Sequence, residues 1–331
     1  MKAVVCTEYG PPSKLRLLDL PTPVPGPRQV VVTNHVAGVN FPDTLIIQGR
    51  YQLQPTLPFS PGAELAGVIK QVGSEVRSFR PGEKVIALPQ YGAFAQEVAV
   101  DVDKLIPLPP TFDASALEAA GSFTLAYGTS LHALQDRARA QSGETLLVLG
   151  AAGGVGLAAV ELGKLLGLRV IAAASSQEKL EIARRYGADE HIDYSREDLR
   201  ERVKALTGSR GVDIVYDPVG DKFAEPALRC VGWNGRYLVV GFAAGEIPRI
   251  PLNLPLLKGC AVMGVFFGEF ARREPQQHAE NLRLLLSWLE AGRIRPFISA
   301  RYPLSQVPRA LEALLARKVT GKVIILPQQT D

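Results

Sequence analysis

One segment constrains this 331-residue chain more than any other: a short apolar run, a glycine-rich turn and a helical pattern in direct succession. The run 145–149 predicts a strand, 150–156 a turn, and the apolar spacing beyond Gly156 a helix. In α/β proteins this arrangement holds a dinucleotide pyrophosphate, because glycines let backbone N–H groups approach the phosphates and the helix dipole favours negative charge. The G-x-G-x-x-G match is incomplete, since Ala151 replaces the first glycine. The predicted cofactor contacts here are Ala152, Gly153, Gly154, Val155 and Gly156.

The next predicted strand, 169–174, indicates which dinucleotide this would be. NAD sites carry an acidic residue about 20 residues beyond the fingerprint, where it binds the ribose 2′-hydroxyl. Here Ser175 and Ser176 follow the strand, and Lys179 lies one helical turn further. Hydroxyls and an ammonium suit a 2′-phosphate, so we expect NADP(H). The alternative is that Ser176 only caps the next helix and that Lys179 is solvated.

Composition excludes several classes of protein. With 47% hydrophobic and 21% charged residues the chain is globular, and its length suits two domains. The net charge of +4 comes without a basic cluster interleaved with aromatics, so we expect no nucleic-acid partner. No apolar run approaches the ~20 residues that span a membrane. The start of the chain lacks a signal-peptide pattern, and three scattered cysteines form no C-x-x-C pair, so we expect a cytoplasmic protein.

The chain divides into two regions with different sequence patterns. The first hundred residues hold short strand-like runs between prolines and glycines, which predicts an all-β unit. After a helical segment near 113–120, strands and helices alternate, which predicts a parallel sheet of six strands in the order 3-2-1-4-5-6. A closing helix–strand–helix–strand pattern is expected to fold back on the β unit. The expected later strands are 190–193, 212–217, 235–240, 261–266, 300–303 and 322–326, and the expected helices are about 124–139, 155–167, 177–186, 197–206, 222–231, 279–291 and 306–316.

Six motifs in this order resemble the zinc-free quinone oxidoreductase branch of the medium-chain dehydrogenase/reductase superfamily. They are Gly38-Val-Asn-Phe-Pro-Asp43, Pro61-Gly-Ala-Glu-Leu-Ala-Gly67, Pro81-Gly-Glu-Lys-Val85, Gly92-Ala-Phe-Ala-Gln-Glu97, Ala151-Ala-Gly-Gly-Val-Gly156 and Gly321-Lys-Val-Ile324. The resemblance implies a GroES-like β domain, residues 1–120 plus 268–331, with an inserted Rossmann domain, residues 121–267. It also implies an active site in the cleft between them.

Zinc ligands of the related alcohol dehydrogenases are missing. Asn40 stands in the region of their first cysteine ligand, and Gly62-Ala63-Glu64 replaces their G-H-E motif. Four dispersed histidines do not provide three or four converging ligands, so we expect no metal. Without a Lewis acid, hydride transfer to an electron-poor conjugated acceptor is favoured over alcohol oxidation.

The resemblance assigns roles on the acceptor side to Asn40, Asp43 and Tyr51. Asn40 either hydrogen-bonds the cofactor or acceptor, or caps the helix expected at 41–48. Asp43 is either a site residue or a first-turn acid, and Tyr51 is either a carbonyl donor or structural. Glu64, which lies close to the metal in zinc relatives, is expected here to be a structural hydrogen-bond acceptor.

On the cofactor side the resemblance adds Thr124, Tyr194 and Lys322. Ligands of such sheets lie at the carboxyl ends of the strands, which adds Gly241, Phe242 and Phe267. Thr124 opens the first Rossmann helix in this interpretation and lies beside the nicotinamide, although it could merely cap that helix. Tyr194 follows the third strand, and Gly241 and Phe242 follow the fifth. Phe267, at the end of the sixth, either meets the nicotinamide or plugs the space between domains.

The sequence thus predicts an NADPH-dependent reductase of quinones or similar conjugated carbonyls. An enoyl-thioester or 2-alkenal reductase is the alternative, and a non-catalytic nucleotide-binding protein is a third possibility. The apolar run from Cys260 to Phe266 is expected at the open edge of the Rossmann sheet, so we also predict a homodimer formed through that strand.

Overall fold

The computed structural model describes residues 1–329 and divides into two compact units. One unit combines Met1–Leu125 with the chain from Pro296 onward, and the other is Ala126–Arg295. The second unit is therefore inserted in the first, as the sequence predicted. It ends 28 residues beyond the expected boundary at 267, because α9 (Pro275–Glu290) packs within it: the Asn281 amide donates to Asp136 at 2.8 Å.

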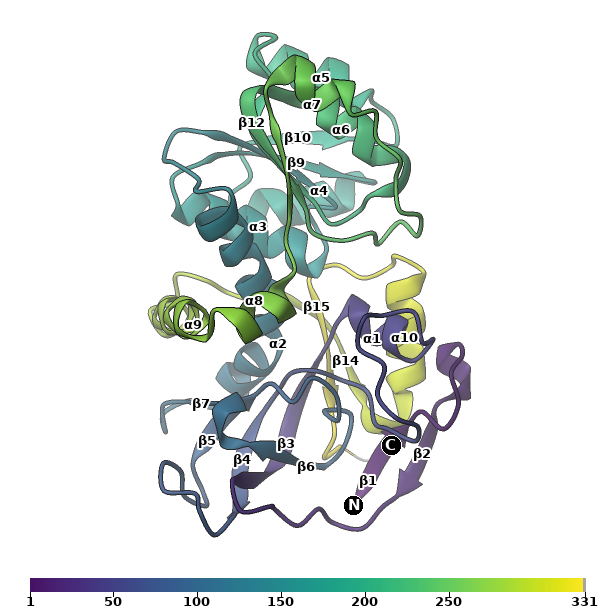
Figure 1. Ribbon diagram of the computed structural model, residues 1–331, viewed down its shortest axis with the longest axis vertical. Coiled ribbons are helices and arrows are strands. Elements are labelled where there is room, and N and C mark those ends of the chain that lie inside the picture. The colour runs from purple at the N-terminus through teal and green to yellow at the C-terminus, as the bar shows by residue number, and fades with distance from the viewer. Residues whose placement is uncertain (330–331) are drawn as a thin grey trace. The chain divides into compact units, whose positions relative to one another are not determined.

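A six-stranded sheet forms the centre of the inserted unit (Figure 1). Its order is β10-β9-β8-β11-β12-β13 and every neighbouring pair is parallel, which confirms the predicted 3-2-1-4-5-6 arrangement. The strands are β8 (Thr145–Leu149), β9 (Arg169–Ala174), β10 (Glu190–Asp193), β11 (Val212–Asp217), β12 (Val231–Val239) and β13 (Ala261–Gly264). The first four match their predicted bounds. The sixth ends two residues early, because Phe267 begins a helix rather than following the strand directly.

Helices connect these strands and cover the sheet. They are α3 (Gly154–Leu165), α4 (Gln177–Arg185), α5 (Leu199–Thr207), α6 (Ala224–Cys230), α7 (Asn253–Lys258) and α8 (Phe267–Arg273). Figure 1 shows α5, α6 and α7 gathered near one another. Their apolar residues, with those of the strands, form a core that includes Leu147, Ile171, Val215 and Leu228.

The segment expected as two helices is one. The helix α2 runs from Ala114 to Leu131 and continues as a π-helix over His132–Arg137. It begins where the Asp113 carboxylate accepts the Ala116 N–H at 2.9 Å. Thr124 consequently lies in the middle of the helix, so the expectation that it opens or caps a helix is wrong.

The other unit is built on a mainly antiparallel seven-stranded sheet of order β14-β15-β3-β4-β5-β7, with β6 paired to β3. Its bounds are β1 (Lys2–Val5), β2 (Arg16–Asp19), β3 (Gln29–Val39), α1 (Phe41–Ile46), β4 (Leu65–Val72), β5 (Lys84–Ala87), β6 (Glu97–Asp101), β7 (Leu105–Pro107), β14 (Ile298–Pro303), α10 (Val307–Leu315) and β15 (Lys322–Leu326). The β1–β2 hairpin stands apart from this sheet. The chain's end folds back as predicted, since β15 pairs antiparallel with β3 and sets Val323 opposite Val39. This register brings Lys322 to the end of β3.

Among residues 1–329, no helix has both the length and the apolar character needed to cross a membrane.

Candidate functional site

The turn between β8 and α3 has the geometry of a phosphate-binding loop. Gly150 adopts a left-handed φ of +57°, and its carbonyl accepts the Gly153 N–H at 2.9 Å. A Cβ on Gly156 would lie 2.2 Å from the Gly150 oxygen, so only glycine lets the helix start so close to the strand. Gly153 is the N-cap of the twelve-residue α3, whose first turn carries no acid. The backbone N–H groups and the helix dipole therefore favour an anion here.

The missing first glycine also has a structural explanation. Ala151 is buried and its N–H donates to the Ala173 carbonyl at 3.1 Å, which ties the turn to β9. The position that needs a left-handed conformation is Gly150, one residue earlier than the fingerprint frame placed it. A side chain at 151 is accordingly tolerated.

Two of the residues predicted to read the adenosine ribose lie together at the carboxyl end of β9. The Ser175 hydroxyl accepts a hydrogen bond from the Lys179 ammonium at 3.2 Å; Ser175 is exposed and Lys179 is partly exposed. The Ser176 hydroxyl accepts the Lys179 N–H at 3.3 Å as the N-cap of α4, so the capping role anticipated for it is present. Tyr194 follows β10, and its ring packs against Phe223 at 4.6 Å between centroids. Positions 175 and 176 hold serines and not the acidic residue typical of NAD sites. Contact between these residues and a cofactor stays a prediction.

Asp217, which sequence analysis did not single out, organises the turn after β11 through its carboxylate and the loop after β12 through its backbone carbonyl. Its carboxylate closes β11 and accepts the N–H groups of Val219 and Gly220 at 2.7 and 2.8 Å. The Tyr237 hydroxyl donates to it as well. Burial raises the pKa of Asp217. An Asp as the last residue of a predicted strand was the available signal.

Gly241 and Phe242 lie in that loop, as predicted, at the carboxyl ends of the strands. The Gly241 N–H donates to the Asp217 carbonyl. The Phe242 ring packs against Gly220 so closely that a Cβ on that glycine would lie 2.7 Å from the ring. Beside Phe242 lies a mainly apolar hollow of about 130 Å³. Its apolar wall suits a flat ring better than a charged group.

Phe267 has a packing role within the inserted unit. Its ring lies 2.6 Å from the Cβ position of Gly128. It packs at a tilt near Phe270 and edge-to-face with His278, at 6.3 and 5.2 Å between centroids. It begins α8 instead of ending a strand. These contacts explain the residue without a cofactor, and its predicted nicotinamide contact has no support from them.

A buried polar network holds the other candidate group together. Glu64 is fully buried, and one of its carboxylate oxygens accepts the Asn40 amide at 2.8 Å and the Lys322 ammonium at 3.0 Å. The other oxygen accepts the Leu125 N–H at 2.9 Å. The Lys322 ammonium also donates to the Asn40 side-chain oxygen at 2.6 Å and to the Val39 carbonyl at 3.2 Å.

This network decides between several of the alternatives that the sequence left open. Glu64 is a structural acceptor, as expected. Lys322 is only 4% exposed, and its three N–H donors meet three protein acceptors. No donor of the ammonium is left over for a cofactor, so the structure gives no support to the predicted cofactor contact of Lys322. Asn40 is committed to Glu64 and Lys322 through its side chain while it occupies the N-cap position of α1.

Asp43 and Tyr51 lie next to this network. The Asp43 carboxylate accepts the Asn40 backbone N–H at 2.7 Å, which makes it a first-turn cap of α1. Burial raises the pKa of Asp43 to about 7, although the Asn40 N–H and the Lys322 ammonium oppose the shift. Tyr51 is half-buried, and burial together with the nearby Asp43 raises its pKa. The Tyr51 hydroxyl makes no hydrogen bond within residues 1–329.

Thr124 is a predicted residue whose hydroxyl is buried without a hydrogen-bond partner in the described part of the chain. It is fully buried in α2, and its hydroxyl has no hydrogen-bond partner among the described residues. Buried hydroxyls are normally bonded, because an unmade hydrogen bond costs about 1–3 kcal/mol. An orphaned hydroxyl of this kind fits a residue that bonds a ligand.

Two family models match the chain: Alcohol dehydrogenase GroES-like domain over residues 26–110, and Zinc-binding dehydrogenase over residues 154–287. The sequence is 38% identical to Quinone oxidoreductase-like protein 2 homolog of Nematostella vectensis, covering 99% of this chain and 89% of that one. It is 36% identical to a quinone oxidoreductase of Pseudomonas aeruginosa, covering 98% and 99%.

This chain belongs to the quinone oxidoreductase branch of the medium-chain dehydrogenase/reductase superfamily. It is accordingly an oxidoreductase. The structure resembles Escherichia coli quinone oxidoreductase complexed with NADPH, with a TM-score of 0.90, 29% identity and 99% and 100% of the chains covered. It also resembles a 2-haloacrylate reductase, with a TM-score of 0.84, 29% identity and coverage of 99% and 100%.

The residues of this medium-chain reductase do not fit zinc, although one matching model carries a zinc-binding description. Ala63 offers no ligand atom, and Asn40 and Glu64 bind the Lys322 ammonium instead. A divalent ion beside that ammonium would be repelled, and zinc prefers thiolate and imidazole ligands. Within residues 1–329, no group of three His, Cys, Asp or Glu side chains is placed to hold a metal.

Proposed function

We propose that this reductase transfers hydride from NADPH to a quinone or another conjugated carbonyl, without a metal. The observation that carries the proposal is the buried Asn40–Glu64–Lys322 network, which stands where zinc relatives keep their ligands. With an ammonium in place of a Lewis acid, an alcohol is not readily turned into an alkoxide. An electron-poor acceptor needs no such activation.

Bound NADPH would supply the hydride, and the chain's residues would bind and orient the two reactants. The turn at Gly153 and Gly156 is proposed to hold the pyrophosphate, and the orphaned Thr124 hydroxyl to bond the nicotinamide end. Tyr51, whose hydroxyl has no partner in the described protein, is proposed to donate to the acceptor carbonyl. That hydrogen bond would stabilise the charge that develops on oxygen.

Cofactor choice is the first test. A Lys179 ammonium bonded to Ser175 can bind a 2′-phosphate, so we expect wild type to bind NADPH about 10–100-fold more tightly than NADH. Lys179→Ala should remove most of this preference. Arg185 is an exposed cation at the far end of the same helix, so Arg185→Gln is the matched control and should not change the preference for NADPH. Equal dissociation constants for the two cofactors in wild type would refute the assignment.

A second candidate is reduction of a 2-alkenal or enoyl thioester, and the likeness to a 2-haloacrylate reductase favours testing it. The test is a screen of NADPH oxidation against quinones, enals and enoyl thioesters. The proposal expects the highest kcat/KM with a quinone. Turnover confined to enals or thioesters would replace the first candidate with the second. No turnover with any acceptor would favour a non-catalytic nucleotide-binding protein.

Tyr51→Phe separates orientation from proton donation. If Tyr51 polarises the acceptor, kcat should fall by up to ~10²-fold, and more for an enal than for a quinone, because the enal depends more on carbonyl polarisation. Asn40→Ala should have a graded effect rather than abolish turnover, although it also removes bonds to Glu64 and Lys322. A silent Tyr51→Phe on every acceptor would make Tyr51 structural. Complete inactivity would make it an obligatory donor.

We further propose a homodimer formed through β13. This strand pairs with β12 on one side only within the described residues, and its Val262 and the nearby Phe266 are 40% and 49% exposed. An unpaired apolar edge favours pairing with its twin. Light scattering should give about twice the 35.7 kDa chain mass. Val262→Lys should give the monomer, whereas Leu18→Lys, at a similarly exposed apolar residue of the other unit (37%), should not. Monomeric wild type would contradict the proposal.

The predicted cytoplasmic location stays a prediction.

A further inference from the structure

A second, basic hollow lies in the inserted unit. Its volume is about 270 Å³, and its walls come from α5, the loop that precedes β11, the end of α6, the start of β12 and the end of α7. Five cationic side chains line it, and no acidic side chain does. These cations are Arg200, Lys204, Arg210, Arg229 and Lys258.

The hollow is separate from the proposed cofactor site. Gly211 directly precedes β11 and Val231 begins β12, so the hollow lies at the amino ends of these strands. The glycine turn at Gly153 follows the carboxyl end of β8. All six strands are parallel, which places the two sites at opposite edges of one sheet.

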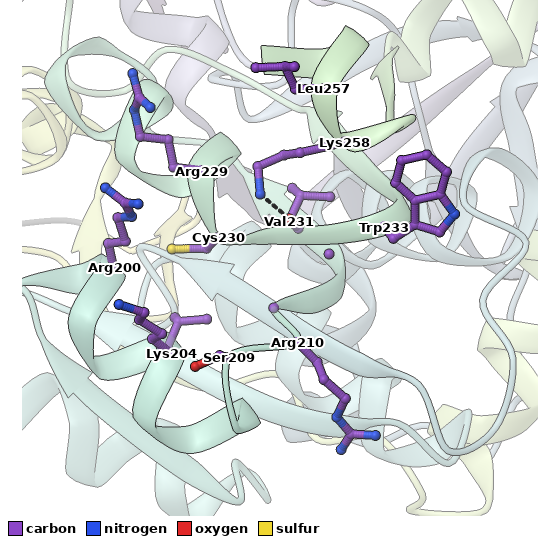
Figure 2. A pocket seen from close by; sticks show the side chains of 13 residues that line it. Arg200, Lys204, Ser209, Arg210, Arg229, Cys230, Val231, Trp233, Leu257 and Lys258 are labelled. Atoms are coloured by element: carbon purple, nitrogen blue, oxygen red, sulfur yellow. Dashed lines mark hydrogen bonds between the residues drawn. The ribbon is translucent and has the colours of Figure 1, made fainter.

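Four of the five cations lie on the walls that α5, α6 and α7 contribute to the hollow. Figure 2 shows Arg200, Lys204 and Arg229 on one side of the hollow and Lys258 extending across its middle. The guanidinium of Arg210 extends away from them and donates to the Thr207 carbonyl. The remaining four groups supply the positive charge that an anion would meet. Arg229 already pairs with Glu225 at 2.6 Å and Lys204 with Glu201 at 3.7 Å, and the Lys258 ammonium donates to the Val231 carbonyl at 2.6 Å, so a ligand would share these groups with the protein.

Helix stability explains some of these cations but not Arg200. Lys204, Arg229 and Lys258 lie in the last turns of α5, α6 and α7, where a positive charge favours the helix dipole. Arg200 lies in the first turn of α5, where the dipole disfavours it. Arg200 also forms no ion pair within residues 1–329. Its position is therefore explained neither by the helix dipole nor by an ion pair.

The remaining walls indicate the kind of anion. Trp233 is 74% exposed and Leu257 70%, and Figure 2 shows the indole at the opposite end of the hollow from Arg200. A ligand that reached both ends would be elongated, with charge at one end and a flat apolar group at the other. Cys230 also lines the hollow, but burial raises its pKa to about 12, so it offers no thiolate for covalent chemistry.

We propose that this hollow binds a polyphosphate chain. Arg200, Lys204, Arg229 and Lys258 would contact the phosphates, because guanidinium and ammonium groups make charge-assisted hydrogen bonds to several phosphate oxygens at once. The chain could belong to a nucleotide, whose base would stack on Trp233, or to inorganic polyphosphate.

The experiment measures binding of ATP and of tripolyphosphate by calorimetry in buffer without divalent cations, with the full-length protein. Both should bind wild type, and affinity should fall as salt rises from 50 to 200 mM. Arg200→Gln and Lys204→Gln should each weaken binding by about tenfold. Arg185→Gln, an exposed arginine outside the hollow, is the matched control and should leave affinity unchanged. Thermal melting of each variant confirms that it is folded.

Two further arms identify the source of the polyphosphate. Tighter binding of ATP than of tripolyphosphate, with the difference lost in Trp233→Ala, would assign a nucleotide. Equal affinities would assign inorganic polyphosphate. Lys179→Ala removes the cation of the proposed cofactor site and should not affect either ligand. The inference is overturned if neither ligand binds wild type, or if binding is indifferent to both Arg200→Gln and Lys204→Gln.

Discussion

Replacement of Lys322 by methionine tests whether an ammonium serves as the internal counter-ion of this fold. The Lys322 side chain is 4% exposed, and its ammonium lies 3.0 Å from the fully buried Glu64 carboxylate. Lys322→Met keeps much of the apolar stem but removes this positive charge. Breaking a buried ion pair in this way costs about 3–5 kcal/mol. Glu64 would keep the Asn40 amide and the Leu125 N–H as donors, so we expect the lower end, about 3 kcal/mol.

The double variant Lys322→Met/Glu64→Gln should recover most of that loss. With no ammonium to accept, the Asn40 amide can turn so that its oxygen accepts the new Gln amide, while the Gln oxygen still accepts the Leu125 N–H. No buried charge then remains. Recovery to within about 1 kcal/mol of wild type would be evidence for the pair rather than for the lysine stem.

Urea unfolding followed by far-UV circular dichroism provides the measurement, with hydrogen exchange of β3 and β15 amides as the local readout. Both tryptophans lie in the inserted unit, so their fluorescence would not report this one. Lys70→Met is the matched control, because the Lys70–Glu97 pair is short at 2.6 Å but the lysine is 48% exposed. It should cost less than about 1 kcal/mol. An equal cost for Lys322→Met and Lys70→Met would refute the reasoning.

Three other predictions follow from the geometry. Asp43 has a folded-state pKa of about 7 against an ordinary value of 3.8, so the folded state binds more protons between these values. Its contribution to stability should therefore decline as pH rises from about 4 to 7; the difference between wild type and Asp43→Asn in urea midpoints should show that slope, and a flat difference would contradict it. Gly156→Ala should lower both stability and NADPH affinity, because its Cβ would meet the Gly150 oxygen at 2.2 Å. Gly153→Ala, with 3.4 Å to the same atom, should keep the melting temperature and lose affinity alone, and equal stability losses in the two variants would be inconsistent with this account. Dialysis against a chelator should leave NADPH oxidation unchanged, and stoichiometric zinc by elemental analysis would contradict metal independence.

The acceptor site was the part that sequence patterns could predict least. Residues 40, 43, 51 and 64 were singled out, but for each the pattern left a structural role open. The structure assigns Glu64, Asn40 and Asp43 to one buried hydrogen-bonded group, and for Thr124 it replaces a helix-opening position with a mid-helix one. The basic hollow was not anticipated, since its cations are spread from Arg200 to Lys258 and form no run in the sequence.

The sequence by itself determined the parallel sheet, its strand order and the glycine turn. These depend on local signals, such as apolar runs of strand length, helical spacing and a glycine where a Cβ would strike the preceding turn. Only the tertiary structure decided the partners of Lys322. The pairing of β15 with β3 brings Lys322 to Glu64 and Asn40, which precede it in the chain by 258 and 282 positions. Hydrogen bonds over such separations depend on which strands meet and in which register, and neither is encoded in the residues around Lys322.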